Sequence, residues 1–253
     1  MAGNSLDLLV QLQVDLCGWD FSELAIAEAD LRQVNLAGVS FQNADLAKSI
    51  FSESLNVAMS IDISPDGQMV AVGDSSCMVH LWNIATNQLL ATFEGHTGPV
   101  WSVVFSPDGN TLASSGSDAS VPLWDVRSGQ CLRVLTEHTG CVWSVSFSPD
   151  GQRLASDDRT VRVWNLQAEC LHILKHRAKN VYSVHFWPDN QTLASGSHDT
   201  SIRIWNAIDG NCLGVLHGHT ASVRCVRYSP DGQSILDLRC KDFGLTSPYK
   251  LWD

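Results

Sequence analysis

The chain has 253 residues, enough for one large domain or two modest ones, and its 44% hydrophobic and 17% charged residues predict a soluble globular protein. Its 16 basic side chains stand against 27 acidic ones, which gives a formal net charge of −11. Because bulk binding to nucleic acid depends on neutralising phosphates with basic side chains, this balance excludes nucleic acid as the expected partner.

The opening segment carries no targeting signal. MAGNSLDLLVQLQVDLCGW lacks a basic stretch and a long apolar run, so we expect no secretory signal. No segment approaches the roughly 20 apolar residues of a membrane helix, and we expect no membrane association. The eight cysteines form no CxxC pair, and Cys131, Cys170 and Cys212 share one repeat position in expected outer strands. We therefore predict reduced cysteines and a cytoplasmic protein.

A short repeat comes first. From Leu16 to Phe51 a large apolar residue recurs every five positions, and a smaller or apolar residue stands two positions before most of these. A period of five fits neither the helical 3.6 nor the strand period of 2. It fits a chain that turns a corner every five residues, with four sides per coil. An amphipathic helix is the alternative, and Gly18 and Gly38 weigh against it.

The units DLRQV, NLAGV, SFQNA and DLAKS resemble the pentapeptide-repeat family, which implies a right-handed square β-helix. Eight units make only about two coils, too few for a stable solenoid alone. We predict an N-terminal cap over residues 1–14 and a pentapeptide-repeat β-helix over residues 15–55.

A longer repeat follows, built around a tight turn. The turn reads SPDG at residues 64–67, 106–109, 148–151 and 229–232, and WPDN at 187–190. Proline presets one backbone angle of such a turn, and Asp-Gly supplies the positive φ that closes it. The turn recurs about every 42 residues, a period typical of propellers or solenoids. A tryptophan that closes a short apolar alternation follows each copy.

One unit divides into four short strands, VWSVVF, TLASSG, VPLWDV and CLRVL, separated by turns. Four antiparallel strands per repeat form the blade of a β-propeller. GHTGPV at 95–100, GHTASV at 218–223 and LWD at 123–125 resemble the WD-repeat family. The predicted fold class is all-β, an incomplete WD-repeat β-propeller preceded by the short pentapeptide-repeat β-helix. The propeller covers residues 56–253 in five units, the last one truncated, at about 56–95, 96–137, 138–175, 176–217 and 218–253.

The WD-repeat resemblance implies a buried hydrogen-bond chain of histidine, serine, aspartate and tryptophan in each complete unit. The residues at these positions are His96, Ser114, Asp118 and Trp124, then His138, Ser156, Asp158 and Trp164, then His176, Ser195, Asp199 and Trp205. Serine, histidine and aspartate also suggest a hydrolase. A nucleophile should occur once beside an oxyanion site, however, whereas this set recurs. We predict that these residues are structural and that the protein is not an enzyme.

The first, third and fifth units depart from this pattern. The first has Val72 and Ser76 at the serine and aspartate positions and is expected to lack the chain, as terminal repeats often do. The third loses two residues before its turn aspartate, so its turn must be tighter. The fifth has His219 but no serine on its second strand, with Asp242 as the candidate aspartate, and it lacks a fourth strand.

In this family a partner touches the top face of the propeller, at residues that flank the first valine of each inner strand or precede a turn aspartate. The resemblance places Met59, Trp101, Trp143, Asn180, Tyr182, His198 and Arg224 there. Trp, Tyr and Arg are enriched at binding hot spots, although packing around the central channel is the alternative. The remaining histidines make only a weak zinc candidate, and we predict no metal and no cofactor.

We predict a non-enzymatic protein-protein interaction scaffold or sensor module. The pairing of pentapeptide and SPDG-type repeats resembles the C-terminal region of cyanobacterial nucleotide-binding/WD-repeat signalling proteins, and a fragment of such a protein is expected. No G-x-x-x-x-G-K-[ST] loop is present. The alternatives are an acidic pentapeptide mimic of DNA that binds a nucleic-acid enzyme, and a decayed, non-functional fragment. Self-association through open propeller edges and closure of the ring are left open.

Overall fold

The structure is a computed structural model that describes residues 16, 18–23, 39–40, 42–44, 57–176, 180–229, 234–239 and 249–252. The chain divides into two compact units, Met1–Leu55 and Asn56–Asp253. Every helix or strand assigned in the described ranges is a β-strand, which agrees with the predicted all-β class. Over those ranges, no helix has the length and apolar character needed to cross a bilayer.

In the first unit, two segments that are far apart in sequence run side by side. Asp20 forms a parallel bridge with Ser40, and the N–H of Phe21 donates to the carbonyl of Ser40 at 2.9 Å. Residues 20 and 40 are separated by four pentapeptides, which agrees with a four-sided coil. Leu16 and Phe21 occupy the five-residue repeat positions and are buried. The predicted cap and most of the repeat lie outside the described residues.

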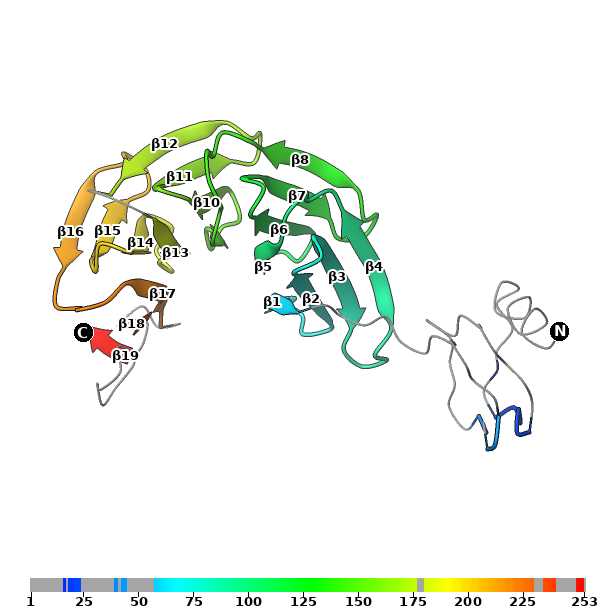
Figure 1. The fold of residues 1–253 in the computed structure, drawn as a ribbon. Helices are drawn as coiled ribbons and strands as arrows, with labels where there is room; N and C mark the ends of the chain where they lie inside the picture. The colour runs from blue at the N-terminus through cyan, green and yellow to red at the C-terminus, as the bar shows by residue number, and fades with distance from the viewer. Residues whose placement is uncertain are drawn as a thin grey trace. The chain divides into compact units, whose positions relative to one another are not determined.

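The second unit contains five antiparallel sheets that follow one another in chain order and correspond to propeller blades (Figure 1). Blade 1 has β1 (Ala58–Ile63), β2 (Met69–Asp74), β3 (Met78–Asn83) and β4 (Leu89–Glu94). Blade 2 has β5 (Val100–Phe105), β6 (Thr111–Gly116), β7 (Val121–Asp125) and β8 (Cys131–Leu135). Blade 3 has β9 (Val145–Phe147), β10 (Arg153–Asp157), β11 (Thr160–Asn165) and β12 (Cys170–Lys175). Blade 4 has β13 (Val181–Phe186), β14 (Thr192–Ser197), β15 (Ile202–Asn206) and β16 (Cys212–Leu216), and blade 5 has β17 (Val223–Tyr228), β18 (Ile235–Arg239) and β19 (Tyr249–Trp252).

The SPDG turns close the first hairpin of the blades. In blade 1, Ser64 Oγ donates to Asp66 Oδ1 at 2.6 Å and accepts the N–H of Met69 at 2.9 Å. Gly67 takes a φ of 71°, which costs a glycine little. In the WPDN variant, Asn190 reaches a φ of 62°, a conformation that asparagine tolerates better than most residues. Local turn chemistry therefore sets the start of each second strand.

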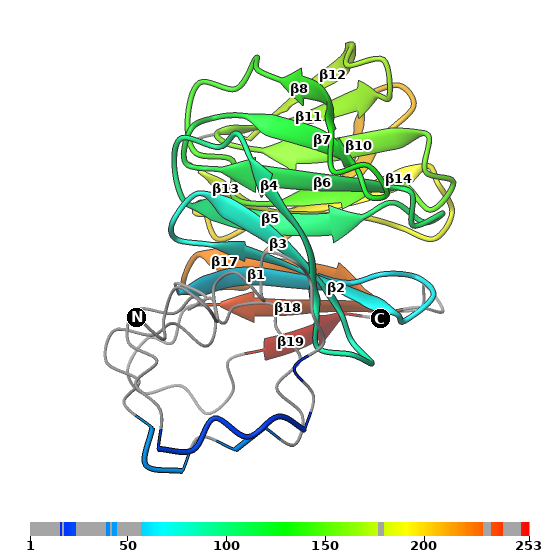
Figure 2. The ribbon, with the colours of Figure 1, turned by 90° about the vertical axis from the view of Figure 1, so that its right-hand side faces the viewer.

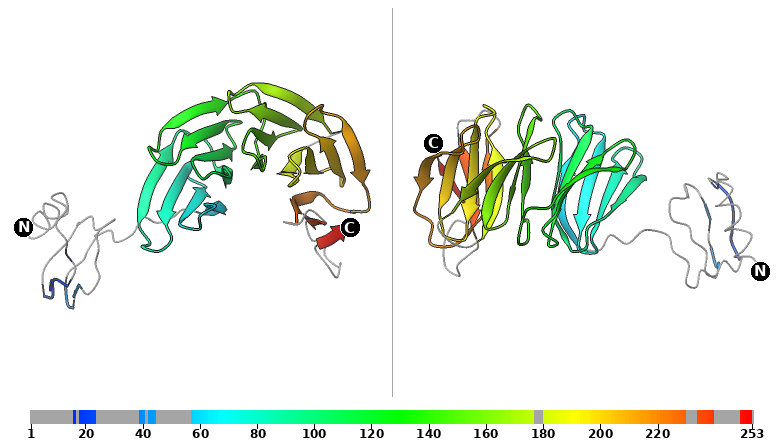
Figure 3. Two further views of the ribbon diagram at one scale, coloured as in Figure 1. Left: turned by 180° about the vertical axis from the view of Figure 1, so that it is seen from behind. Right: turned by 90° about the horizontal axis from the view of Figure 1, so that it is seen from above.

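Polar links join the inner strands of successive blades. In blades 1 to 4, a serine on the first strand, or directly before it in blade 3, accepts a backbone N–H from the first strand of the next blade. The pairs are Ser60 with Val103 at 3.1 Å, Ser102 with Val145 at 3.4 Å, Ser144 with Val184 at 3.3 Å and Ser183 with Val226 at 3.0 Å. The sheets therefore stand face to face around an arc of blades (Figures 2 and 3).

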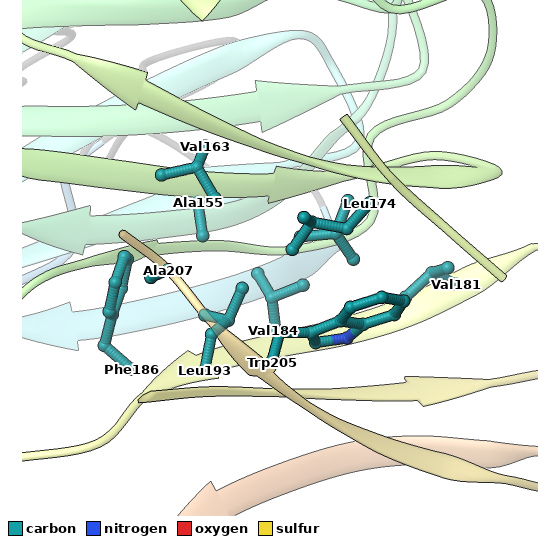
Figure 4. Packing of buried hydrophobic residues seen from close by; sticks show 10 residues of the cluster. Ala155, Val163, Leu174, Val181, Val184, Phe186, Leu193, Trp205 and Ala207 are labelled. Carbon is teal, nitrogen blue, oxygen red and sulfur yellow. The ribbon is translucent and has the colours of Figure 1, made fainter. Parts of the chain in front are cut away.

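Apolar clusters fill each junction between blades. We call the side of a blade that packs on the following blade its forward face, and the opposite side its rear face. Between blades 3 and 4, Ala155 and Val163 of the forward face share a cluster with Val184, Phe186 and Leu193 of the next rear face (Figure 4). The four junctions repeat this arrangement, so each pair of neighbouring blades shares its own apolar cluster.

Candidate partner-binding surface

Blade 2 contains a complete histidine-serine-aspartate-tryptophan chain. His96 Nε2 lies 2.8 Å from Ser114 Oγ, and Trp124 Nε1 donates to the same oxygen at 2.8 Å. His96 Nδ1 lies 2.9 Å from Asp118 Oδ2, so a proton on Nδ1 leaves Nε2 free to accept from the serine hydroxyl. Burial lowers the pKa of His96, which agrees with a neutral ring in this chain.

Blades 3 and 4 repeat the histidine-serine-tryptophan part of this geometry, with the aspartate farther from the ring. The histidine-serine distances are 2.6 Å for His138–Ser156 and 2.7 Å for His176–Ser195, and both Trp164 and Trp205 donate to the serine at 2.8 Å. Asp158 and Asp199 lie 3.3 and 3.6 Å from Nδ1 of their histidines. The third unit absorbs its shorter sequence in the tight turn between β10 and β11, where the N–H of Asp158 donates to the carbonyl of Thr160 at 3.0 Å.

These chains have the geometry of a structural support. The serine hydroxyls of Ser114, Ser156 and Ser195 are fully buried, and each contacts both a histidine and an indole. A substrate cannot reach a hydroxyl that is enclosed and already bonded, and the same arrangement occurs in three blades. The geometry therefore favours a role in holding strands together over nucleophilic catalysis.

Blade 1 uses a different polar pair, which the sequence comparison of units missed. Asp74, at the end of β2, lies 3.3 Å from Nε2 of His80 on β3. Val72 occupies the serine position, and the buried Nε1 of Trp82 has no hydrogen-bond partner in the part of the chain that the structure describes. The sequence held one signal for this pair: Asp74 stands two residues before Ser76, and the Ser76 hydroxyl donates a hydrogen bond to its carboxylate.

Blade 5 also substitutes its chemistry. Asp237 on β18 occupies the serine position and lies 3.1 Å from His219, measured between Oδ2 and Nε2. Counting forward from the SPDG turn would have found it, because Asp237 has the same offset from that turn as Ser114. The aspartate considered from the sequence, Asp242, lies outside the described residues.

The residues expected on the top face of blades 2 to 5 form a continuous row. The rings of Trp101 and Trp143 lie 4.8 Å apart between centroids, and those of Trp143 and Tyr182 lie 5.6 Å apart. The guanidinium carbon of Arg224 stands 4.0 Å from the centre of the Tyr182 ring. The three rings are half-buried and Arg224 is exposed. We call these four residues the aromatic row.

The other expected residues lie at the margins of the row. The ring of His198 lies 6.1 Å from that of Tyr182, and its backbone N–H donates to the carbonyl of Asn180 at 2.9 Å. Met59 takes the matching position on β1 and brings a thioether in place of a ring. At the blade 2 end, Trp101 Nε1 donates to Ser117 Oγ at 2.6 Å, which fixes the orientation of that indole.

A buried carboxyl supports the centre of the row. Asp157 Oδ1 accepts the backbone N–H groups of Trp143 and Ser144 at 3.1 and 3.0 Å. Complete burial raises the pKa of Asp157 well above its ordinary value. The Asp157 carboxyl therefore holds the backbone of Trp143 through Oδ1, and Oδ2 has no hydrogen-bond partner within the described ranges.

The described histidines and cysteines do not gather into a metal centre. Over the described ranges, no group of three or more His, Cys, Asp or Glu side chains is placed to hold an ion. The cysteines in those ranges are free thiols, and Cys131, Cys170 and Cys212 begin the outer strands β8, β12 and β16.

Two protein families match the chain. The family described as WD domain, G-beta repeat matches residues 49–83, 87–125, 129–165, 168–206 and 210–236, and the family described as Pentapeptide repeats (8 copies) matches residues 20–54. The WD match at 87–125 runs from the outer strand of blade 1 to the third strand of blade 2. Sequence repeats and blades are thus offset by one strand: this repeat contains the fourth strand of blade 1 and the first three strands of blade 2.

Similar proteins of known sequence share part of this chain. An uncharacterized WD repeat-containing protein of the cyanobacterium Nostoc sp. is 45% identical over 102 residues, which cover 40% of this chain and 8% of that protein. A second one from the same strain is 39% identical over 97 residues, or 38% and 6%. The nuclear distribution protein PAC1 of Arthroderma benhamiae is 47% identical over 57 residues, or 22% and 11%. The chain therefore spans a small fraction of the length of these relatives.

Proposed function

The chain belongs to the WD domain, G-beta repeat family, whose members generally act as protein-interaction scaffolds, and we propose that its aromatic row binds a segment of a partner protein. The observation that carries the proposal is the continuity of the row. Trp101, Trp143, Tyr182 and Arg224 come from four different blades, yet each contacts the next.

The exposure of these side chains favours binding over packing. The strand tryptophans Trp124, Trp164 and Trp205 are buried and donate to serines, as structural residues should. Trp101, Trp143 and Tyr182 are only half-buried, so part of each residue remains accessible to water. Removing such aromatic surface from water is the main source of energy at binding hot spots. A partner segment that crosses the row would bury it.

We further propose that this binding serves a sensor or scaffold module of a larger signalling protein. Two features support this: the chain matches short stretches of much longer Nostoc proteins, and it joins pentapeptide and WD repeats in one polypeptide. WD repeats typically carry no enzyme activity. The buried serines are consistent with that role.

A peptide selection tests the proposal. Peptides selected from a random displayed library on the whole chain should bind the wild type and lose affinity for the Trp143→Ala and Arg224→Ala variants. Removing a hot-spot side chain typically costs about 2 kcal/mol of binding free energy, which raises Kd by roughly 30-fold. Titration calorimetry resolves a change of this size.

The matched control is Leu132→Ala, because Leu132 is an exposed apolar residue on the outer strand β8, away from the inner-strand row. This variant should bind the selected peptides like the wild type. Arg224 is exposed, so its replacement separates binding from folding. Peptides that bind all three variants with equal affinity would show that the row is not the binding surface.

A further inference from the structure

The rear face of blade 1 exposes apolar residues that every other blade buries. Ile61 and Ile63 on β1 are 67% and 56% exposed. Their counterparts face the preceding blade and are at most 7% exposed. These counterparts are Val103, Val145, Val184 and Val226 for Ile61, and Phe105, Phe147, Phe186 and Tyr228 for Ile63.

The second strand and the tryptophan of blade 1 show the same contrast. Val70 and Trp82 are half-buried, whereas Leu112 and Trp124 in blade 2 are buried against the preceding forward face. The rear face of blade 1 is therefore shaped like a junction, and none of the described sheets of the second unit covers it.

On the forward face of blade 5, one described position shows the same contrast. Leu236 on β18 is 43% exposed. The four alanines at this position in the other blades, Ala71, Ala113, Ala155 and Ala194, are fully buried in the junction clusters. An exposed leucine at a position where the other blades place a buried alanine presents extra apolar area to a following blade.

We propose that the forward face of blade 5 in one chain packs on the rear face of blade 1 in a second copy, so that the chains associate head to tail. Leu236 then packs against Ile61 and Ile63. The four junctions within the chain are the template for this contact. Such heterologous contacts form rings when the rotation closes and filaments when it does not. This inference is independent of what the aromatic row binds.

Two single variants and their mixture test the proposal by analytical ultracentrifugation. The wild type should form assemblies that grow with concentration. Ile61→Asp blocks one face and Leu236→Asp blocks the other, so each variant alone should be a monomer. In an equimolar mixture each variant still has one intact face, and the mixture should form a dimer and nothing larger. Leu132→Asp, on an outer strand, should assemble like the wild type.

Other results would overturn the proposal. A wild type that remains a monomer at every concentration excludes the contact. An assembly that survives Leu236→Asp but not Ile61→Asp indicates that two blade 1 faces pair instead. Since Ile61 is exposed, its replacement should leave the thermal unfolding of the monomer cooperative, and Ile63→Asp provides a second variant of the same face.

Discussion

The Nε2 atom of His219 lies 3.1 Å from Oδ2 of Asp237, and both side chains are fully buried. In blade 2 the same position on the second strand is Ser114, which bridges a histidine and an indole. Blade 5 thus keeps a polar anchor for its histidine by placing a carboxylate where the serine would be. Its irregular sequence reflects a change of chemistry in this part of the blade, and blade 1 makes a similar change with Asp74 and His80.

The shared acceptor in blade 2 should be important for stability. Replacing Ser114 by alanine leaves Trp124 Nε1 without its acceptor and His96 without its hydroxyl partner. Leaving buried polar groups unbonded costs about 1–3 kcal/mol, so we expect a loss of about 2 kcal/mol in the free energy of unfolding in urea. Ser128→Ala, in an exposed turn, should change it by less than about 0.5 kcal/mol. Equal effects of the two substitutions would contradict this role.

The unbonded indole of Trp82 leads to the opposite prediction. Val72→Ser places a hydroxyl at the position that accepts the tryptophan N–H in blades 2 to 4. The new hydrogen bond should offset most of the lost apolar burial, so the cost should be under about 1 kcal/mol. Val79→Ser, in a fully buried position without such a donor, should cost about 2–3 kcal/mol. Thermal unfolding that shows the same loss for both would refute the assignment.

The junction between blades 4 and 5 depends on a glycine. A Cβ added at Gly196 would lie 2.7 Å from Val223 Cγ1 and from Val226 Cγ2, closer than such atoms can approach. Gly196→Ala should therefore destabilise the chain by about 1–3 kcal/mol. At Gly214 a Cβ meets nothing within 4 Å, so Gly214→Ala should be neutral or stabilise by roughly 0.5–1 kcal/mol. Comparing the two melting temperatures checks the difference, and a stabilising Gly196→Ala would exclude the close contact.

The blades were predictable because their signals are local. The SPDG turn and the alternation that leads to Trp124 lie within a few residues of one another, so spacing alone marks the strands. The pair Asp74–His80 was missed because it forms between two strands, where register decides which side chains meet. Asp237 was missed because only a serine was sought at its position on the second strand. Likewise, repeat position indicated the residues of the aromatic row. The contacts between these residues depend on the rotation that relates one blade to the next, and no sequence motif encodes that rotation.

Buried histidines should make the fold sensitive to mild acid. Burial lowers the pKa of His176 to about 4 and that of His185 to about 4, from an ordinary value of 6.5. Between those limits the unfolded chain binds more protons than the folded one, so the free energy of unfolding falls as the pH falls from about 6.5 to about 4. For His176 the loss is about 3 kcal/mol. It should be complete near pH 4.

Urea unfolding at several pH values across that window provides the measurement. His176→Gln removes one of the two titrating groups and should reduce the dependence on pH, while the contribution of His185 remains; His217→Gln, at an exposed position, is the control substitution. A wild type whose stability is constant from pH 7 to pH 4 would show that burial does not lower the pKa of these rings in the folded chain.

The carboxyl of Asp157 should show the opposite dependence on pH. Its burial raises the pKa well above 3.8, so its stabilising contribution is fully present below that pH and is lost as the pH rises through the folded pKa. Asp157→Asn cannot ionise and keeps the oxygen that accepts the N–H groups of Trp143 and Ser144. We therefore expect Asp157→Asn to be at least as stable as the wild type at neutral pH, with an advantage that grows with pH until the wild-type carboxyl is ionised. Asp157→Ala loses both hydrogen bonds and should be less stable by about 2 kcal/mol. A wild type that gains stability over Asp157→Asn as the pH is raised above 7 would mean that the carboxylate is bound in its charged form.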